Sequence, residues 1–446
     1  MHDLACLIFL GAFIAMGLRK PFLLVLVYVY IDVVAPQRLT YYLLNAVPIS
    51  AIAVGLAVAG WLVIDDKRDA RVAPRQGLIL ALLGYCYVTT VQADFPVDAL
   101  DKWEWVWKAL AFAAFLPLTL RTRLRIEALL LFMVLSASSI IIVGGIKTLV
   151  SGGGYGELNL MVTNNSGLYE SSTIATVAVA IVPLILWFVR HGTVFPPDWR
   201  VRCFGYALAF ACLLIPVGTS ARTGLLCIGL LAVLMLRTVK RRALYLGAIA
   251  LVGVAAVPLL PSAFTQRMGT IKTYDADASA SSRLAVWKWT LEFVKLHPFG
   301  GGFEAYRQNN IRFDVKKIQG AQTAGARVEV DKGRAYHSAY FEMLGEQGWP
   351  GLILWLFIHL SGVVRMEMLR RRYQTGEYAW AGSLAGALQS VQLIYLLGAA
   401  FIAIAFQPVI YMLIGAQIGL DTYLARRRKE AMPQGFRTRR VAAVPA

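Results

Sequence analysis

Long apolar runs follow one another along the chain from Leu4 to Leu424, separated by short polar connections. Most runs are about twenty residues long, which is the length a helix needs to cross the hydrocarbon core of a bilayer. Apolar and polar residues do not alternate within the runs, so helices are favoured over the strands of a membrane barrel. The pattern therefore predicts an all-α polytopic membrane protein with about 12–13 transmembrane helices. The first run is expected to be the first span, because no basic flank precedes it and no small-residue cleavage site follows it.

Lysine and arginine collect in every second connection, and such clusters mark the cytoplasmic side of a membrane protein. The clusters are Arg19-Lys20, Lys67 to Arg75, Arg121 to Arg125, Arg190 to Arg202, Arg237 to Arg242, Arg365 to Arg372 and Arg426 to Arg440. The connections expected on the outer side are Asp32 to Asn45, Ala93 to Glu104, Ser151 to Ser172, Thr219 to Thr223, Leu259 to Ser338 and a turn near Gln407-Pro408. This alternation predicts an N-terminus outside and a C-terminus in the cytoplasm.

The longest polar segment divides the chain into four regions. We expect a transmembrane helical region at 1–258, an outer loop region with a surface helix at 259–338, C-terminal transmembrane helices at 339–425 and a basic cytoplasmic tail at 426–446. The loop region contains twelve Lys or Arg against seven Asp or Glu, although positive charge is normally sparse on the outer side. This surplus suits an anionic substrate, and a solvated surface of mixed charge is the alternative.

The composition narrows the function classes. Only 16% of the residues are charged and 58% are hydrophobic, against about 25% charged in soluble domains. The net charge of +18 is spread over the cytoplasmic connections without interleaved aromatic residues, so we expect no nucleic-acid partner. The predicted spans carry almost no ionisable side chains away from their ends, which argues against an ion-coupled transporter.

Cysteines and paired aspartates give little reason to expect a metal. The cysteines lie inside predicted spans without CxxC spacing, so we expect free packing thiols, with no disulfide and no zinc site. They are Cys6, Cys86, Cys203, Cys212 and Cys227. Asp275-Ala276-Asp277 has the spacing of the carboxylate pair that holds a divalent metal in many glycosyl-transferring enzymes. Its Ser/Ala/Asp-rich surroundings favour a plain loop, and a metal role is the minor alternative.

The turn from Gly218 to Gly224 places Arg222 at the outer rim, at the start of a helix. A partly desolvated guanidinium offers a planar fork of donors that fits phosphate oxygens. The helix N-terminus adds partial positive charge. Arg222 is therefore a candidate phosphate-binding residue, and an interfacial arginine that pairs with lipid headgroups is the alternative.

A second candidate segment begins with the serines before Arg283. The sequence from Ser281 to Val294 predicts a helix along the membrane surface, with Arg283, Trp287, Leu291 and Val294 on one face. This arrangement would place an arginine at the beginning of a helix that lies on the bilayer.

His297-Pro298-Phe299-Gly300-Gly301-Gly302 follows this helix. Proline ends the helix, and the glycines let the backbone pass close to a neighbour or a ligand. A nucleotide-phosphate loop is disfavoured, because no strand precedes the glycines and no Lys-Ser/Thr pair follows them. For His297 a structural role is favoured over a catalytic one.

His337 lies where the long polar segment returns to an apolar run. A neutral imidazole, with an unperturbed pKa of about 6.5, accepts a proton from a sugar hydroxyl at neutral pH. The alternative is a histidine that only caps the next helix. His359 cannot share this site, because the intervening helix, at about 1.5 Å per residue, places it about 33 Å away near the cytoplasmic end.

Three blocks of the sequence resemble, in this order, the successive signatures of the O-antigen ligase superfamily. The blocks are Ser220 to Gly224, Arg283 to Gly302 and His337 to Gly351. That superfamily also includes O-antigen polymerases and O-linking oligosaccharyltransferases. The opening stretch from Asp32 to Arg38 is similar to members described as O-glycosylation ligases.

The resemblance implies a GT-C type glycosyltransferase of the bacterial inner membrane, with its large loop and active site in the periplasm. It implies a donor glycan on undecaprenyl diphosphate, an acceptor hydroxyl on lipid A core oligosaccharide, and membrane lipids as surroundings. By position in the motifs, Arg222 and Arg283 would bind the diphosphate and His337 would act on the acceptor hydroxyl, with inversion and without metal or other cofactor. An O-antigen polymerase or an O-linking protein oligosaccharyltransferase is the alternative enzyme, and a lipid-linked oligosaccharide flippase is the alternative outside enzymes.

Overall fold

The computed structural model describes residues 2–39, 47–68, 70–152, 167–237, 241–244, 246–247, 251, 278–319 and 322–431. Asp275 and Asp277, the candidate metal-binding pair, lie outside the described residues. Residues 259–277 of the outer loop region and residues 432–446 of the basic tail also lie outside them. The predictions for these segments stay predictions.

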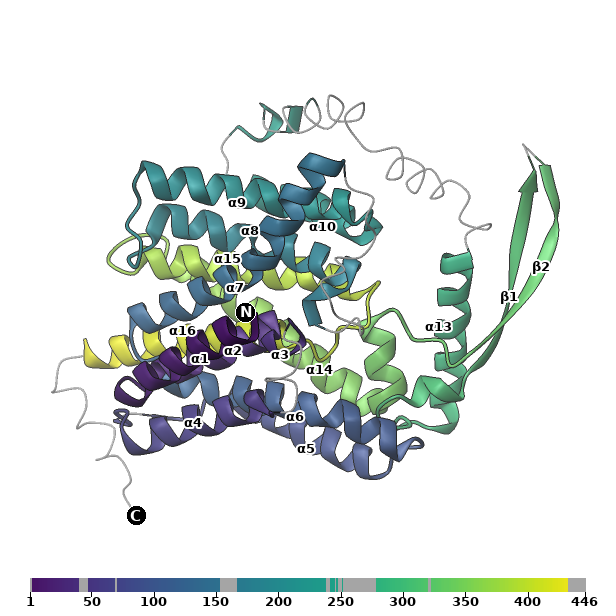
Figure 1. Cartoon of the computed structure of the whole chain (residues 1–446), viewed down its shortest axis with the longest axis horizontal. Coiled ribbons are helices and arrows are strands. Elements are labelled where there is room, and N and C mark those ends of the chain that lie inside the picture. Colours follow the sequence, from purple (N-terminus) through teal and green to yellow (C-terminus); the bar gives the residue numbers. More distant parts are fainter. Residues whose placement is uncertain are drawn as a thin grey trace, which may run out of the picture.

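The long helices lie side by side in one bundle (Figure 1). In chain order the helices outside the loop region are α1 (His2–Arg19), α2 (Phe22–Val34), α3 (Pro36–Leu39), α4 (Ile49–Val63), α5 (Pro74–Val91), α6 (Pro96–Thr119), α7 (Arg123–Ser151), η1 (Gly167–Tyr169), α8 (Ser171–His191), α9 (Trp199–Gly218), α10 (Arg222–Leu236), α14 (Ala339–Arg372), α15 (Ala379–Ala399) and α16 (Pro408–Glu430). Six helices within the described residues are long and apolar enough to cross a membrane: α7, α8, α9, α14, α15 and α16. The chain is an all-α polytopic membrane protein, as the apolar runs predict.

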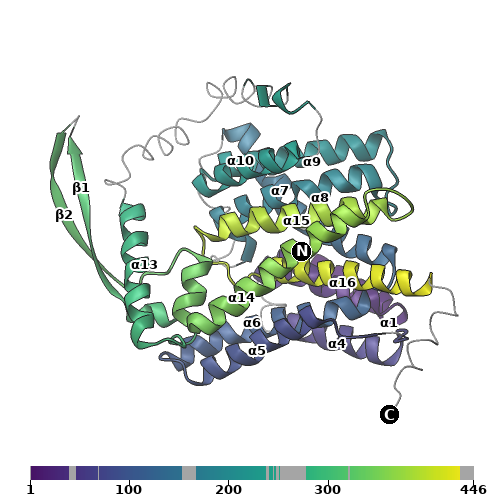
Figure 2. The same ribbon diagram turned by 180° about the vertical axis from the view of Figure 1, so that it is seen from behind.

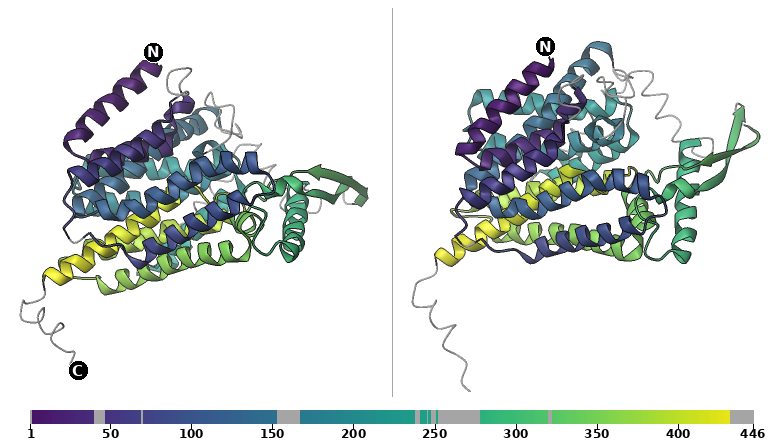
Figure 3. Two further views of the ribbon diagram at one scale, coloured as in Figure 1. Left: turned by 90° about the horizontal axis from the view of Figure 1, so that it is seen from below. Right: turned by 60° about the horizontal axis from the view of Figure 1, so that its bottom comes forward.

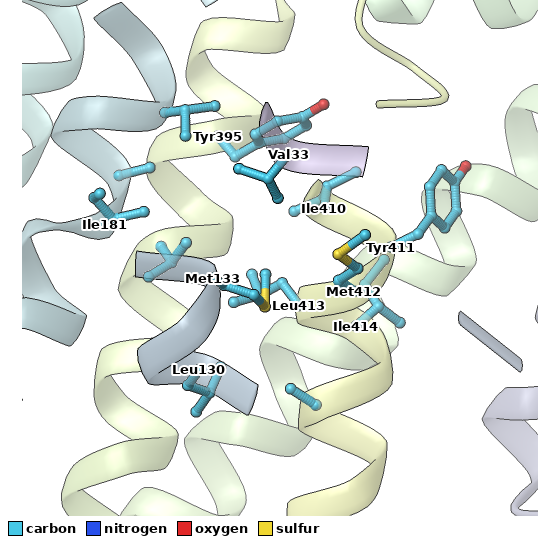
Figure 4. Close-up of a cluster of buried hydrophobic side chains, with 14 of the residues drawn as sticks. Val33, Leu130, Met133, Ile181, Tyr395, Ile410, Tyr411, Met412, Leu413 and Ile414 are labelled. Carbon is cyan, nitrogen blue, oxygen red and sulfur yellow. The ribbon is translucent and has the colours of Figure 1, made fainter. Parts of the chain in front are cut away.

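The centre of the bundle is built around α16. Figure 4 shows Val33 of α2, Met133 of α7, Ile181 of α8 and Tyr395 of α15 gathered near Leu413 of α16, and all five are buried. Between lipid-embedded helices the surrounding tails are as apolar as the side chains, so close packing rather than burial from water must hold the helices together.

Two glycines of α16 allow α6 to approach closely. A Cβ added at Gly415 would lie 2.9 Å from a side-chain carbon of Leu116, and one added at Gly419 would lie closer still to Leu120. Small residues at such contacts are the usual means by which membrane helices pack. A larger side chain at either glycine would push α6 away from the centre.

Basic connections lie together at one end of the bundle. Arg125 Nη1 is 2.7 Å from Asp65 Oδ2, and Arg123 Nη2 donates a hydrogen bond of 2.9 Å to the carbonyl oxygen of His191. These contacts join the connections that follow α4, α6 and α8, each of which carries a cluster of Lys and Arg. The C-terminal end of α16 lies at this same end (Figure 1).

The opposite end of the bundle carries the described part of the outer loop region. Here α13 (Ala278–Leu296) runs across the ends of the long helices, and η4 (Ala305–Gln308) leads into β1 (Asn310–Gln319) and β2 (Gln322–Lys332) (Figures 1 and 2). The strands pair antiparallel and project from the bundle as a ribbon (Figure 3). The helix predicted in this region is present, whereas the ribbon was not predicted.

A strand signal for the ribbon exists in the sequence. Ile311, Phe313 and Val315 alternate with polar residues, which is the period of a strand. In the structure Ile311 and Phe313 are buried beside Val286 of α13, so they anchor the base of the ribbon. Farther along the ribbon, Val328 of β2 is 60% exposed. Because the far part of the ribbon is exposed, its sequence does not need a long run of alternating apolar residues.

α13 packs on the rest of the protein through a face that the sequence analysis did not single out. Ser282, Val286, Thr290 and Val294 are buried, whereas Leu291 is 44% exposed. Thr290 Oγ1 donates a hydrogen bond of 2.8 Å to the carbonyl oxygen of Val286, which satisfies the hydroxyl inside the contact. A pattern built on apolar residues alone misses this face, because the hydroxyl residues Ser282 and Thr290 occupy half of it.

Candidate active site

The backbone at His337 is held in an unusual conformation. Its φ is +48°, in the left-handed region that residues other than glycine rarely adopt. The main chain three residues earlier, at Arg334, is held by the side chain of Asn309. Asn309 Nδ2 donates to the carbonyl oxygen of Arg334 at 2.8 Å, and Asn309 Oδ1 accepts from the Arg334 N–H at 2.9 Å. Ser338, which follows His337, occupies the N-cap position of α14. Strain of this kind is typical of functional sites, where the surrounding contacts over-determine the backbone.

Trp287 of α13 holds the chain on both sides of His337. Its Nε1 donates a hydrogen bond of 2.9 Å to the carbonyl oxygen of Tyr336. Its ring stacks on Phe341, with 4.9 Å between ring centroids and 3° between the planes. Arg283 lies one helical turn before Trp287, so the same helix that supports His337 also presents a guanidinium.

The glycine-rich segment after α13 docks onto α14. The Gly301 N–H donates to the carbonyl oxygen of Gly345 at 3.0 Å, and the Gly302 N–H donates to that of Glu346 at 2.9 Å. Gly348 interrupts α14 with a φ of +63°, which creates the kink where this segment fits. The prediction of a close backbone approach is confirmed, and the neighbour is the first part of α14.

A cavity of ≈ 580 Å³ opens beside His337, which is within the usual size range of small-ligand sites. Its walls come from α6, the start of α8, α13, η4, the start of α14 and the connection between α15 and α16. The lining residues are Asp98, Asp101, Lys102, Trp105, Glu170, Ser172, Thr173, Arg283, Glu304, Tyr306, Arg307, Ala335, Tyr336, His337, Glu342, Glu346, Phe401, Ile402, Ala403, Ile404, Phe406 and Gln407.

An ion cluster forms the floor of this cavity. Lys102 Nζ lies 2.7 Å from Glu342 Oε1 and 2.8 Å from Glu346 Oε2. The Glu304 N–H donates to Glu346 at 3.1 Å, and the Ala405 N–H donates to Glu342 at 2.9 Å. Sequence reasoning missed this cluster, because Lys102 was expected in a loop. It comes to the carboxylates only in the assembled bundle, where α5 packs against both α6 and α14.

The acidic wall of the cavity is also partly neutralised. Arg307 Nη2 lies 3.2 Å from Asp98 Oδ1, and its Nε lies 3.1 Å from Glu304 Oε2. Tyr306 donates a hydrogen bond of 2.7 Å to Glu304. Burial first, and then this carboxylate, raise the pKa of the Tyr306 phenol, so the hydroxyl stays a donor.

His337 lies in a locally positive field. Burial, followed by the positive charges of Arg283 and Arg334, lowers the pKa of His337 to about 4, against a smaller opposing effect of Glu170. The Glu170 carboxylate is occupied as the cap of α8, where it accepts from the Thr173 N–H at 2.6 Å. The imidazole is therefore neutral at physiological pH and has a nitrogen that can accept a proton.

Arg222 occupies a different position from the other two predicted site residues. Arg283 and His337 line the cavity, whereas Arg222, the first residue of α10, is not among the lining residues. A Cβ added at Gly224 would lie 3.1 Å from the Cβ of Ala175, so the start of α10 packs behind the wall that α8 contributes. The diphosphate-binding role of Arg222 stays a prediction.

The remaining histidines with predicted roles lie away from the cavity lining. His297 is exposed and stacks on Phe293, with 4.4 Å between ring centroids, which agrees with a structural role. His359 is fully buried within α14, and its Nδ1 lies 3.1 Å from Gln392 Nε2. It sits nearer the middle of α14 than its end, so the expected place close to the cytoplasmic end is wrong.

The bundle interior is more polar than predicted. From His359 a hydrogen-bonded chain continues through Gln392 to Gln417, whose Nε2 donates to Gln392 Oε1 at 2.9 Å. Arg75 then donates to Gln417 Oε1 at 3.1 Å, and the missing side chain of Gly362 leaves room for the guanidinium. The sequence does not predict this hydrogen-bonded network, because the glutamines lie on separate helices, α15 and α16, and only the packing of these helices brings them together.

Comparison with known proteins divides the chain into two parts. Residues 1–193 match a model described as a family of unknown function, and residues 207–356 match the model described as O-antigen ligase. The chain is also 28% identical over 153 residues to the exopolysaccharide production protein ExoQ of Rhizobium meliloti (strain 1021). This match covers 33% of the chain and 34% of that protein, so the chain spans about a third of the length of the relative.

Both matched parts contribute to the cavity, since Lys102 and Glu170 belong to the first and Arg283 and His337 to the second. The second part contains all the sequence blocks that carry the predicted site. Through residues 207–356 this chain is similar to the O-antigen ligase superfamily, and the match to ExoQ agrees with that similarity.

Proposed function

We propose that this protein is an O-antigen ligase. It transfers a glycan from undecaprenyl diphosphate to a sugar hydroxyl of lipid A core oligosaccharide, as a metal-independent, inverting GT-C type glycosyltransferase. The observation that carries the proposal is the single cavity lined by Arg283 and His337, in which the guanidinium is close enough to act on the pKa of the imidazole. The match of residues 207–356 to the O-antigen ligase family supports the same class of reaction.

His337 is the proposed base. The acceptor oxygen forms a bond to the anomeric carbon while the bond from that carbon to the diphosphate oxygen breaks, and the electron pair leaves with undecaprenyl diphosphate. The proton of the acceptor hydroxyl passes to the free ring nitrogen of His337 and then to solvent. Attack opposite the leaving group inverts the configuration at the anomeric carbon.

Arg283 is the proposed partner of the diphosphate. Charge develops on the leaving oxygen, and a guanidinium already in place stabilises it without reorganisation. The effect of Arg283 and Arg334 on the His337 pKa supports a positive field where such an anion would bind. The bound diphosphate would in turn raise the pKa of His337 towards the working pH, which makes the imidazole a better base. Arg222 is proposed to act on the diphosphate from the side of α8.

The other side of the cavity suits the sugars. Asp98, Asp101 and Glu304 offer carboxylate oxygens that accept hydrogen bonds from hydroxyl groups. Trp105 and Tyr306 add apolar ring surface. A cationic side for the diphosphate and an acidic, aromatic side for the glycan match the two halves of the proposed donor.

We place the protein in the bacterial inner membrane, with the His337 cavity towards the periplasm and the end of α16 in the cytoplasm. The basic connections at the opposite end of the bundle support this orientation. Both substrates are lipid-anchored, so they would reach the cavity from the bilayer.

An O-antigen polymerase is the second candidate. The similarity to an exopolysaccharide production protein favours it, because that name ties the relative to polysaccharide production. Both reactions would use the same donor, the same arginines and the same base. They differ in the acceptor, which is lipid A core in one case and a second lipid-linked glycan in the other.

Reconstitution with defined substrates tests these proposals. The purified protein in liposomes would receive undecaprenyl diphosphate-linked glycan alone, or together with lipid A core or a pilin-like protein, with and without a chelator. We expect ligated lipid A core by mass spectrometry, unaffected by the chelator. Chain extension with the donor alone identifies a polymerase, transfer to the protein identifies an oligosaccharyltransferase, and no transfer to any acceptor contradicts the enzymatic proposal.

A further inference from the structure

A second cavity lies at the end of the bundle away from His337, between α8, α10, α14 and α15. Its volume is ≈ 270 Å³, and Arg190 of α8, Arg237 after α10 and Arg370 of α14 line it. Both α8 and α14 begin beside the His337 cavity and end here, so the length of the bundle separates the two cavities. The proposed transfer reaction makes no use of this second cavity.

Positive charge exceeds negative charge around this cavity. The Glu367 carboxylate lies 3.1 Å from Arg237 Nη2, 2.7 Å from Arg370 Nη2 and 2.6 Å from Arg371 Nε. Arg190 forms no ion pair with any acidic residue in the described part of the chain. One carboxylate thus serves three guanidinium groups, two of which line the cavity together with Arg190, and a bound anion would offset the cost of holding these arginines near each other.

The cavity has one wall of small residues and one apolar wall. Gly382, Gly386 and Ser390, spaced four residues apart along α15, line one side. A Cβ added at Gly386 would lie 3.0 Å from Arg370 Cδ, so the glycine leaves room for this arginine to lie over α15. Leu186 of α8 lines the facing side. The cavity walls therefore combine guanidinium groups, which donate hydrogen bonds to an anion, with an apolar surface against which lipid acyl chains can pack.

We propose that this cavity binds the phosphodiester headgroup of an anionic phospholipid in the leaflet at this end of the bundle. The volume lies just below the range of about 300–1,000 Å³ typical of small-molecule sites, so it fits a headgroup and not a whole lipid. Arginine forks match phosphate oxygens, and basic pockets between transmembrane helices bind anionic lipid headgroups. The acyl chains would remain in the bilayer along the apolar wall. This proposal does not depend on the proposed glycosyl transfer.

The test compares lipids bound to the full-length protein in detergent micelles by native mass spectrometry, with phosphatidylglycerol and phosphatidylcholine added at equal concentration. We expect phosphatidylglycerol to be retained and to raise the unfolding temperature, because a ligand that binds only the folded state stabilises it. Phosphatidylcholine should do neither. Equal retention of the two lipids would overturn the proposal, as would displacement of phosphatidylglycerol by inorganic phosphate at the same concentration, which indicates a free-anion site.

Two variants locate the binding. Arg190→Gln should weaken phosphatidylglycerol binding about fivefold, which corresponds to about 1 kcal/mol for one basic residue. Ser383→Leu, at an exposed lining position, should fill the cavity without a change of charge and weaken binding as well. Arg202→Gln, at an exposed arginine in the first turn of α9 and outside the cavity lining, is the matched control. Unchanged lipid binding in either cavity variant, once it is shown to be folded, would contradict the assignment.

Discussion

Trp287 Nε1 donates a hydrogen bond of 2.9 Å to the carbonyl oxygen of Tyr336, the residue that precedes His337. The indole thus fixes the strained turn that presents the imidazole to the cavity. Trp287→Phe keeps a ring that can stack and removes the donor, which leaves the carbonyl oxygen of a buried residue, Tyr336, without this partner. We expect about tenfold lower kcat/KM for glycan transfer, because an unsatisfied group costs about 1–3 kcal/mol and the catalytic geometry loosens.

Trp289→Phe is the matched control for this prediction. Trp289 is also a tryptophan of α13, and its ring stacks on Phe293. Its replacement should leave the rate nearly unchanged. Equal losses in the two variants would assign the effect of Trp287 to general packing instead of the hydrogen bond.

His337→Asn separates chemistry from backbone geometry. Asparagine tolerates the left-handed conformation that His337 adopts with a φ of +48°, but its amide does not accept a proton at neutral pH. Glycan transfer should fall about 100- to 10,000-fold, which is the usual contribution of a general base, while membrane insertion stays normal. His297→Asn, at an exposed histidine outside the cavity, should keep near-normal transfer. Wild-type rates in His337→Asn would remove this residue as the base.

The pH dependence should reflect a neutral histidine. Burial, together with Arg283 and Arg334, lowers the pKa of His337 to about 4, so kcat/KM should stay flat as pH falls from neutrality and should decline only near pH 4. The sign follows from protonation, because an imidazolium has no free nitrogen to accept the acceptor proton. Arg283→Gln removes a nearby positive charge, so in this variant the decline should move to higher pH. A decline centred near pH 6.5, which is about the pKa of an unperturbed histidine, would contradict the buried neutral state.

Lys102→Met should destabilise the protein. It leaves Glu342 and Glu346, both nearly fully buried, without the cation that lies 2.7–2.8 Å away. Breaking a buried ion pair on one side costs about 3–5 kcal/mol, so the unfolding temperature in detergent should drop clearly. The triple variant Lys102→Met/Glu342→Gln/Glu346→Gln should recover part of the loss, because no charge is left unpaired.

An exposed ion pair provides the comparison for this cluster. Lys295 and Glu292 lie 2.7 Å apart with side chains that are 66% and 62% exposed. Lys295→Met should change the unfolding temperature little, since exposed pairs contribute about 0–1 kcal/mol. A similar drop in both variants would contradict the importance of burial in the Lys102 cluster.

Arg222→Lys tests whether the start of α10 acts on the donor. An ammonium keeps the charge and loses the planar fork, so donor affinity should fall about tenfold if the guanidinium reaches the diphosphate. Arg202→Lys, outside the cavity lining at the basic end of the bundle, is the control. Donor affinity equal to wild type in Arg222→Lys would leave Arg283 as the diphosphate partner and assign Arg222 a structural role.

The order of apolar runs and basic connections was enough to establish a polytopic helical membrane protein, because the bilayer imposes span length and charge asymmetry on any such sequence. Local chemistry was also enough to single out Arg283 and His337, and the structure brings both to one cavity. Span length, charge asymmetry and local motifs depend only on residues that are close together in the sequence, so they can be read without the tertiary structure.

Tertiary structure alone decided the rest. Lys102 meets Glu342 and Glu346 across more than two hundred residues of chain, and no local pattern encodes that meeting. The same holds for the second cavity, the one lined by Arg190, because it forms only where the ends of separate helices pack side by side. Spacing along the chain determines which residues share a helix face, but contacts between helices depend on close packing, which exists only in the assembled bundle.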